Sequence, residues 1–222
     1  MNERVLVVID DAFEMSTLVT TLRLNDIDVI GEAKSEGVAI NSLRRLQPDV
    51  ILLDMKIVGI SAVKIAVKMR KIDENVGIVI LNSCSDLRFM GESNDEVPTG
   101  AKILIKKSIV DFTVLCTAIK GSKIAALEKH KVQWINGNTS FQEKAVLELM
   151  AHLTNTQAEV LRLVAGGMTN AQIGRTRYVS EKSVEQVLSR VAQELNVQPD
   201  RNKNMRVQLV GEYYRWLGAP HL

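Results

Sequence analysis

The chain of 222 residues is 46% hydrophobic and 24% charged, with a net charge of +2 at pH 7. This composition excludes a disordered chain, and the length is sufficient for two domains, each with its own core. The longest apolar runs are shorter than the roughly 20 residues of a membrane-spanning helix, so we expect no membrane span. Cys84 and Cys116 lack metal-ligand spacing and no leader precedes the first apolar run, so we expect a reducing, cytoplasmic setting.

Up to residue 121, apolar runs rich in β-branched residues alternate with segments in which apolar residues recur at helical spacing. We expect strands at 4–9, 27–30, 50–53, 76–81 and 102–105, and helices at 13–24, 35–46, 62–71 and 109–120. This alternation predicts a parallel sheet with helices on both faces, in the flavodoxin-like strand order 2-1-3-4-5. The expected fold of residues 1–121 is therefore a doubly wound α/β domain that binds ligands beyond the ends of its first and third strands.

Carboxylates follow two of these strands. Asp10 and Asp11 follow the first strand, and Asp54 follows the third. Because like charges in a shared site repel, these side chains need a cation, and Mg²⁺ is suitable because it prefers oxygen ligands. An aspartate can attack phosphorus and carry the group as an aspartyl phosphate. Lys107, just beyond the fifth strand, is expected to neutralise the added charge.

Residues 1–121 resemble the receiver domain of bacterial response regulators. The resemblance rests on Asp10, Asp11, Asp54 and Lys107, which follow one another along the chain as the matching residues do in that family. The resemblance implies that the three aspartates hold Mg²⁺ and that Asp54 is the phosphoacceptor. It also implies that Lys107 contacts the phosphoryl group, with Lys106 as the alternative if the register differs by one residue. A sensor histidine kinase is then an expected partner.

Some positions depart from the receiver pattern. Asn82, with Ser83 beside it, occupies the position of the hydroxyl that contacts the phosphoryl group, and Leu104 replaces an aromatic residue. The polar stretch 85–99 contains a glycine and a proline and favours a loop where the family has a helix. Two interpretations remain open: phosphorylation of Asp54 controls the protein, or the receiver is not phosphorylated in vivo and serves as a dimerisation or protein-contact module.

Residues 122–152 are expected to form a helical linker, with a turn at 136–138 and a helix from 141 to 152. This helix carries an apolar stripe formed by Val146, Leu149, Met150 and Leu153. Such a stripe is more typical of packing against a neighbouring helical core than of a partner site.

Residues 153–222 contain three consecutive helix starts. Thr154 with Gln157 and Thr169 with Gln172 match capping boxes, and Ser180 caps a third helix. The spacing between the second and third helices leaves room for a turn but not for a loop. This pattern predicts a helix-turn-helix.

The same stretch resembles the DNA-binding domain of LuxR-type transcription regulators. The matching residues are Leu153, Thr154, Glu159, Val160, Leu161, Leu163, Ala165, Gly167, Thr169, Asn170, Ile173, Val179, Ser180, Val184 and Leu188. Glu185 and Val187 depart from the pattern, which usually has Lys and His there, and Gly174 stands where Ala is usual.

The resemblance implies double-stranded DNA as a partner and a homodimer. The expected DNA-contacting residues are Thr169, Asn170, Lys182, Ser183, Glu185, Gln186, Ser189 and Arg190. A last helix, from about residue 204 to 216, is expected to contact a second copy through Val207, Val210, Tyr213 and Tyr214.

Together the two halves predict a response regulator of the NarL/FixJ type, a DNA-binding transcription regulator and not an enzyme. An aspartyl-phosphate enzyme with Asp54 as nucleophile is the alternative from another class. Against it, the chain has no second substrate domain and no acid or base placed beside Asp54. A scaffold that binds only proteins is a third hypothesis, which a gel shift with genomic DNA distinguishes.

Overall fold

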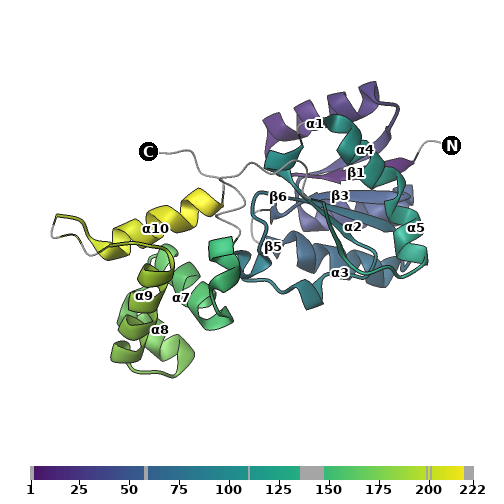
Figure 1. Cartoon of the computed structure of the whole chain (residues 1–222). Coiled ribbons are helices and arrows are strands. Elements are labelled where there is room, and N and C mark those ends of the chain that lie inside the picture. The colour runs from purple at the N-terminus through teal and green to yellow at the C-terminus, as the bar shows by residue number, and fades with distance from the viewer. Residues whose placement is uncertain are drawn as a thin grey trace. The chain divides into compact units, whose positions relative to one another are not determined.

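The structure is a computed structural model that describes residues 3–57, 60–109, 111–135, 148–198, 200 and 202–217 (Figure 1). The chain divides into two compact units. The first comprises residues 1–83 and 94–138, and the second comprises residues 84–93 and 139–222. A short segment from the first half of the chain thus belongs to the second unit.

A parallel sheet forms the centre of the first unit. Its strands are β1 (Arg4–Val8), β2 (Asp28–Ala33), β3 (Val50–Asp54), β6 (Gly77–Asn82), β7 (Lys102–Ile105) and β8 (Gln133–Ile135). They are arranged in the order β2-β1-β3-β6-β7-β8, and each neighbouring pair is parallel. Counted along the chain, the first five strands of this sheet are β1, β2, β3, β6 and β7. Their arrangement is the predicted 2-1-3-4-5 order, which confirms the doubly wound α/β fold. A separate antiparallel pair consists of β4 (Lys56–Ile57) and β5 (Ile60–Ser61).

Helices cover both faces of this sheet (Figure 1). They are α1 (Ala12–Leu24), α2 (Glu36–Leu46), α3 (Ala62–Ile72), α4 (Phe112–Lys120) and α5 (Ser122–Leu127). On one face, α1 and α4 share an apolar core with the sheet, in which Leu22, Leu115 and Ile119 are fully buried. On the other face, α2 and α3 contact each other. Because helices lie on both sides, β3 and β6 are buried along their whole length.

The sheet domain extends beyond the predicted boundary at residue 121. Helix α5 follows α4 almost directly, and β8 pairs in parallel with β7, with Lys102 opposite Gln133. The predicted linker therefore began too early, because a strand of three residues is too short for its alternation to be recognised. The turn expected at 136–138 and residues 141–147 of the expected helix lie outside the described residues, whereas the last residues of that helix, 148–152, are helical as predicted.

The second unit is helical. Besides the helical residues 148–152, its described α-helices are α7 (Asn155–Ala165), α8 (Asn170–Arg177), α9 (Glu181–Glu194) and α10 (Met205–Trp216). Both predicted capping boxes form, at Thr154 with Gln157 and at Thr169 with Gln172. No described helix of either unit is both long and apolar enough to cross a membrane.

The apolar stripe before α7 packs into the core of this unit, as predicted. Met150 and Leu153 are buried there, and Leu149 packs against the same cluster. Val146, the fourth member of the stripe, lies outside the described residues.

The segment 84–93 supplies a fully buried aromatic side chain to the helical unit. Within it, η1 (Leu87–Met90) is a 3-10 turn that contacts α7. The ring of Phe89 packs edge-on against Tyr213 and Trp216 of α10, with centroids 6.2 and 5.3 Å away. Phe89 is therefore a core residue of the helical unit, although it is distant from α10 in sequence.

Arg88 fastens the same segment by hydrogen bonds. Its guanidinium donates to the carbonyl oxygens of Leu153 and Met150, at 2.6 and 3.0 Å, and pairs with Asp86. It thereby gives the Leu153 carbonyl a donor and adds a second donor to the Met150 carbonyl, which also accepts the Leu153 N–H. The predicted absence of an α-helix here is confirmed, because only η1 and a second 3-10 turn, η2 (Asn94–Glu96), form. The place of this segment in the second unit was not predicted.

Candidate functional site

Asp54 ends β3 and lies in the sheet next to the end of β1. Leu53 is opposite Val8 of β1, so Asp10 follows β1 close to Asp54. The Asp54 carboxylate is buried, with 6% of the residue exposed. One oxygen accepts the backbone N–H of Lys56 at 3.0 Å, and the other accepts the ammonium group of Lys106 at 2.5 Å. A cation and a backbone donor therefore hold the predicted phosphoacceptor in place.

Lys106, and not Lys107, is the lysine at this site. The Lys106 ammonium also pairs with Glu14 of α1 at 2.7 Å, whereas Lys107 is exposed. Burial on its own lowers the pKa of Lys106, but its hydrogen bonds to Asp54 and Glu14 raise the pKa above its ordinary value. The structure thus corrects the expectation for Lys107 and selects the alternative register.

Strand alternation explains this one-residue correction. Leu104 of β7 lies in the apolar core that α1 and α4 share with Leu52 of β3. Asp54 is two residues after Leu52, and Lys106 is two residues after Leu104, so both side chains continue on that face. β7 ends at Ile105, and a slip of one residue would direct the lysine to the opposite face.

Asp10, Asp11 and Asp54, the carboxylates expected to hold Mg²⁺, follow neighbouring strands at one edge of the sheet. Their side chains are not arranged around a common point at which a metal ion could bind. Asp11 caps α1, with one carboxylate oxygen accepting the backbone N–H of Glu14 at 2.7 Å. Among the described residues, no group of three His, Cys, Asp or Glu side chains is placed to hold a metal ion. The oxygen ligands are of the type that Mg²⁺ prefers, but Lys106 takes the place of a cation beside Asp54.

Asn82 and Ser83 lie at the end of the neighbouring strand. Leu81 of β6 is opposite Asp54, and Asn82 is the last residue of β6. Asn82 is buried and Ser83 is half-buried. Both predicted phosphate-contacting residues are thus close to Asp54 in the sheet register.

Helix α9 presents a polar, exposed face next to the turn that follows α8. Lys182, Gln186 and Arg190 are exposed and spaced four residues apart, so they lie along one side of the helix. Glu185 and Ser189 are also exposed, and the Ser189 hydroxyl donates to the Glu185 carbonyl at 3.0 Å. On the opposite side, buried Val184, Leu188 and Val191 anchor the helix in the core.

The remaining predicted DNA-contacting residues support the local structure. The Thr169 hydroxyl caps α8, and the Ser183 hydroxyl lies 2.8 Å from that of Ser180, the cap of α9. The Asn170 carboxamide accepts a hydrogen bond from Arg206 of α10 at 2.8 Å. These side chains position the two helices of the motif.

The turn between α8 and α9 explains one departure from the LuxR pattern. Tyr178 ends α8 in the left-handed conformation, with φ of 56°, and Val179 donates its N–H to the Gly174 carbonyl at 2.9 Å. A Cβ atom at Gly174 would lie 2.7 Å from the Val179 carbonyl oxygen, which is too close for any side chain. Glycine is therefore required at position 174 for this turn to remain tight.

Two family models match the chain. The model described as response regulator receiver domain matches residues 5–120, and the model described as bacterial regulatory proteins, luxR family, matches residues 151–203. The chain belongs to the response regulators. With a receiver domain followed by a luxR-family domain, it is a DNA-binding transcriptional regulator of the NarL/FixJ type in two-component signalling.

Several known proteins are similar to this regulator along most of its length. The DNA-binding transcriptional activator EvgA of Escherichia coli is 23% identical over 190 residues, which are 85% of this chain and 90% of EvgA. The transcriptional regulatory protein DegU of Brevibacillus brevis is 25% identical over 236 residues, 96% of each chain. The structure of RcsB from Salmonella enterica serovar Typhimurium, bound to the promoter rprA, has a TM-score of 0.53 at 18% identity and covers 99% of this chain and 100% of RcsB. This structural likeness concerns the fold.

The last helix of the regulator presents only part of the predicted dimer face. Val207 is exposed, Val210 packs partly against the core, and Tyr214 is 45% exposed, with its hydroxyl donating to the Ala165 carbonyl. Tyr213 is buried and contacts Phe89, so the structure contradicts its expected exposure to a partner. Burial raises the pKa of Tyr213 to about 12, and its hydroxyl donates to the Phe89 carbonyl at 2.6 Å.

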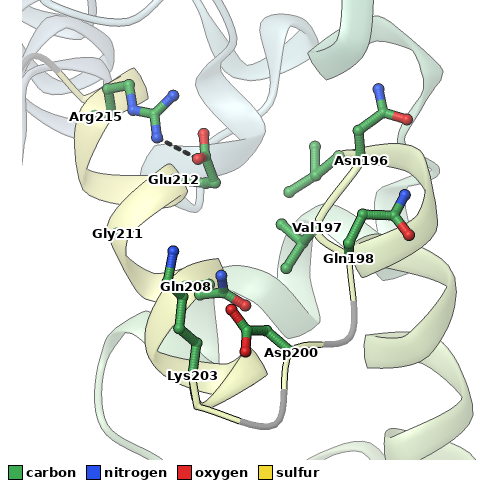
Figure 2. Close-up of a pocket in the computed structure, with 10 residues that line it drawn as sticks. Asn196, Val197, Gln198, Asp200, Lys203, Gln208, Gly211, Glu212 and Arg215 are labelled. Atoms are coloured by element: carbon green, nitrogen blue, oxygen red, sulfur yellow. Dashed lines mark hydrogen bonds and ion pairs between the residues drawn. The ribbon is translucent and has the colours of Figure 1, made fainter.

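A cavity of about 820 Å³ lies on another side of α10, next to the connection from α9 (Figure 2). Its labelled wall residues are Asn196, Val197, Gln198, Asp200, Lys203, Gln208, Gly211, Glu212 and Arg215. Glu212 and Arg215 pair with each other across one turn of α10. This cavity is distinct from the row formed by Val207, Val210 and Tyr214.

One exposed residue of the motif was missed in the sequence. Tyr178, in the turn before α9, is 96% exposed. It ends α8 in the left-handed conformation, within the turn that the sequence predicts between the two helices. A tyrosine at this point adds a hydroxyl donor beside the N-terminus of α9.

Proposed function

We propose that α9 of this regulator is the DNA-recognition helix and enters the major groove. The observation that carries the proposal is the row of exposed Lys182, Gln186 and Arg190 along one side of α9, opposite its buried side. Lys182, in the first turn, contacts backbone phosphates together with the hydroxyl of Tyr178. Gln186 and Arg190 reach base edges, and Glu185 accepts from cytosine N4 or stays in solvent.

The experiment for this assignment is a binding titration on operator DNA at several salt concentrations. Replacing Lys182 by alanine is expected to weaken binding to all sequences alike and to lower the slope of affinity against salt by about 1. Replacing Gln186 by alanine is expected to change sequence preference at a cost of about 1–3 kcal/mol. If Lys182→Ala changed base preference and left the salt slope unaltered, the two roles would be wrongly assigned.

The regulator acts as a homodimer on two half-sites about 10 base pairs apart. A single small helix-turn-helix with few base contacts gives too little affinity and specificity. One structure of RcsB, 20% identical to this chain with a TM-score of 0.56, contains two dimers bound to two parallel DNAs. Val207 and Tyr214 remain accessible for contact with a second copy. A compact, asymmetric footprint with monomer stoichiometry would count against the dimer.

Phosphoryl transfer to Asp54 from a sensor histidine kinase controls this activity in the cytoplasm. A carboxylate oxygen of Asp54 forms the bond to phosphorus while the bond from phosphorus to the donor breaks. Lys106 is already paired with Asp54, so it needs no long movement to pair with the transferred group. Asp10 and Asp11 would hold Mg²⁺, whose positive charge offsets the charge on the phosphoryl oxygens.

The path from Asp54 to the DNA-binding unit runs along the chain from β6. Asn82, next to the residue that pairs with Asp54, is followed by the segment 84–93 in the core of the helical unit. A displacement of the end of β6 would therefore also displace the adjoining segment 84–93, which contains Phe89. The effect on operator affinity is expected to stay below about tenfold, or 1.4 kcal/mol, because Asn82 and Leu104 replace the family's hydroxyl and aromatic residues.

The alternative is a receiver that is not phosphorylated in vivo and serves only as a dimerisation or protein-contact module. The specific observation in its favour is that Lys106 and the Lys56 N–H already satisfy both oxygens of the Asp54 carboxylate. Intact mass after incubation with a small phosphodonor and Mg²⁺ separates the two. A gain of one phosphoryl group that is lost in Asp54→Asn supports control by phosphorylation, whereas an unchanged wild-type mass supports the alternative.

A further inference from the structure

Lys102, the first residue of β7, has a largely buried side chain whose ammonium nitrogen still reaches the surface. Only 9% of its surface is exposed, and within the described part of the chain no hydrogen bond or ion pair reaches its ammonium group. Burial lowers the pKa of Lys102, and no neighbouring carboxylate counteracts this effect. The ammonium nitrogen lies beside Gly121 at the C-terminal end of α4, where the helix dipole favours a positive charge, and it is free to meet a ligand from the adjoining space.

Two cavities share Lys102 and Gln133 in their walls. One, of about 550 Å³, is also lined by Gly121, His130 and Lys131, among others. The other, of about 350 Å³, is bounded by residues of α4 and β8. No aspartate or glutamate is among the described lining residues of either cavity. Glu128 pairs with His130, which lines the larger cavity, but Glu128 itself lines neither of them. The space around Lys102 is therefore roomy, positively charged and without an anion of its own.

The smaller cavity combines apolar and hydroxyl-bearing walls. Val114, Ala118 and Ile135 provide apolar surface, and Thr113 and Thr117 provide hydroxyl groups. Among the described lining residues, Lys102 alone supplies a charge there, as a single compact ammonium group. Such walls suit a ligand that carries one negative charge at one end and a short hydrocarbon body at the other.

We propose that the cavities at Lys102 bind a small monocarboxylate with a short apolar body. The carboxylate pairs with the Lys102 ammonium group, and the hydrocarbon lies against Val114, Ala118 and Ile135. A doubly charged phosphate fits the smaller cavity less well, because Lys102 is the one charged residue among its described lining residues. This site is formed by β7, β8, α4 and α5, and it is separate from the Asp54 site, whose lysine is Lys106.

The geometry supplies a variant that keeps the charge and moves it. A Cβ atom at Gly121 would lie 2.6 Å from the Lys102 ammonium nitrogen, the flexible end of that side chain. Gly121 has φ of −95°, which alanine also adopts, so Gly121→Ala is expected to fold and to displace the ammonium group. Lys102→Met removes the charge at similar volume and is expected to fold, because methionine fills the space of the buried lysine stem.

The test is thermal unfolding of the full chain with sodium butyrate, sodium acetate or sodium phosphate, each compared with sodium chloride at equal ionic strength. Butyrate is expected to raise the unfolding midpoint of the wild type to a plateau, with a dissociation constant on the order of 1 mM for a ligand of this size. Acetate is expected to bind more weakly because it lacks most of the apolar body. Lys102→Met should weaken butyrate binding at least tenfold, and Gly121→Ala should weaken it to a smaller extent.

The matched control is Lys120→Met, which removes an exposed lysine from the end of α4 that lines neither cavity. This variant is expected to keep the full response to butyrate. The proposal is overturned if butyrate has no effect beyond that of chloride on the wild type, or if Lys102→Met and Gly121→Ala respond as the wild type does. A saturable response to phosphate and not to butyrate would overturn the assignment to carboxylates.

Discussion

Replacement of Phe89 by alanine is expected to destabilise the helical unit, although Phe89 is more than a hundred residues before α10 in sequence. The Phe89 side chain is fully buried and packs edge-on against Tyr213 and Trp216. Truncation of a buried phenylalanine usually costs about 3–5 kcal/mol, through lost burial and the cavity left behind. Since Arg88 and the backbone of the segment still hold it in place, the cavity cannot collapse freely, and we expect a loss in this range.

Urea unfolding of the helical unit measures this loss. The chain has two tryptophans, Trp134 in β8 and Trp216 in α10, so a Trp134→Phe background leaves Trp216 to report on the helical unit alone. Phe89→Ala should move the Trp216 transition to lower urea with little change in its slope. The free energy of unfolding follows from the midpoint and the slope.

Phe13→Ala is the matched control, because Phe13 is 82% exposed on α1 in the first unit. An exposed side chain of this kind is expected to contribute within about 0.5 kcal/mol. A loss of less than about 1 kcal/mol in Phe89→Ala, or an equal loss in both variants, would show that segment 84–93 is not part of the helical core in solution.

Two further predictions concern the turn and the acceptor site. Gly174→Ala should destabilise the helix-turn-helix by about 1–3 kcal/mol in the same urea assay, because the added methyl meets the Val179 carbonyl oxygen; unchanged stability would mean that the turn can open without cost. Lys106→Met should destabilise the first unit by about 1–3 kcal/mol at pH 7, since it leaves the buried Asp54 carboxylate without its cation. Lys107→Met, its exposed neighbour, should change stability by less than about 0.5 kcal/mol, and equal effects in the two variants would contradict the assignment of Lys106 to the Asp54 site. The folded protein raises the pKa of Lys106, so the stability that Lys106 contributes is complete below its ordinary pKa of 10.5 and disappears only as the pH rises through the higher folded value. If the difference in unfolding free energy between the wild type and Lys106→Met vanished between pH 6 and 8, the pairing would be refuted.

Much of the architecture could be predicted from local signals in the sequence. Buried strands appear as apolar runs, and the carboxylates that follow them mark the strand ends, so the sequence by itself places Asp10 and Asp54 at one edge of the sheet. The capping boxes at Thr154 and Thr169 could also be predicted from the sequence, because capping depends on residues three positions apart. Such signals involve residues that are close in sequence, so they can be interpreted without knowledge of the tertiary packing.

Features that depend on contacts between distant residues could not be read in this way. The choice between Lys106 and Lys107 depends on where β7 ends and on which face its side chains continue, a difference of one residue that composition does not record. The burial of Tyr213 depends on Phe89, which reaches α10 only because a short segment after β6 packs into the helical core. The sequence predicted a loop over 85–99, and a segment as short as 84–93 has too few residues for a periodic apolar signal. Its place in the core follows from the fit of one side chain between Tyr213 and Trp216, which exists only in the folded chain.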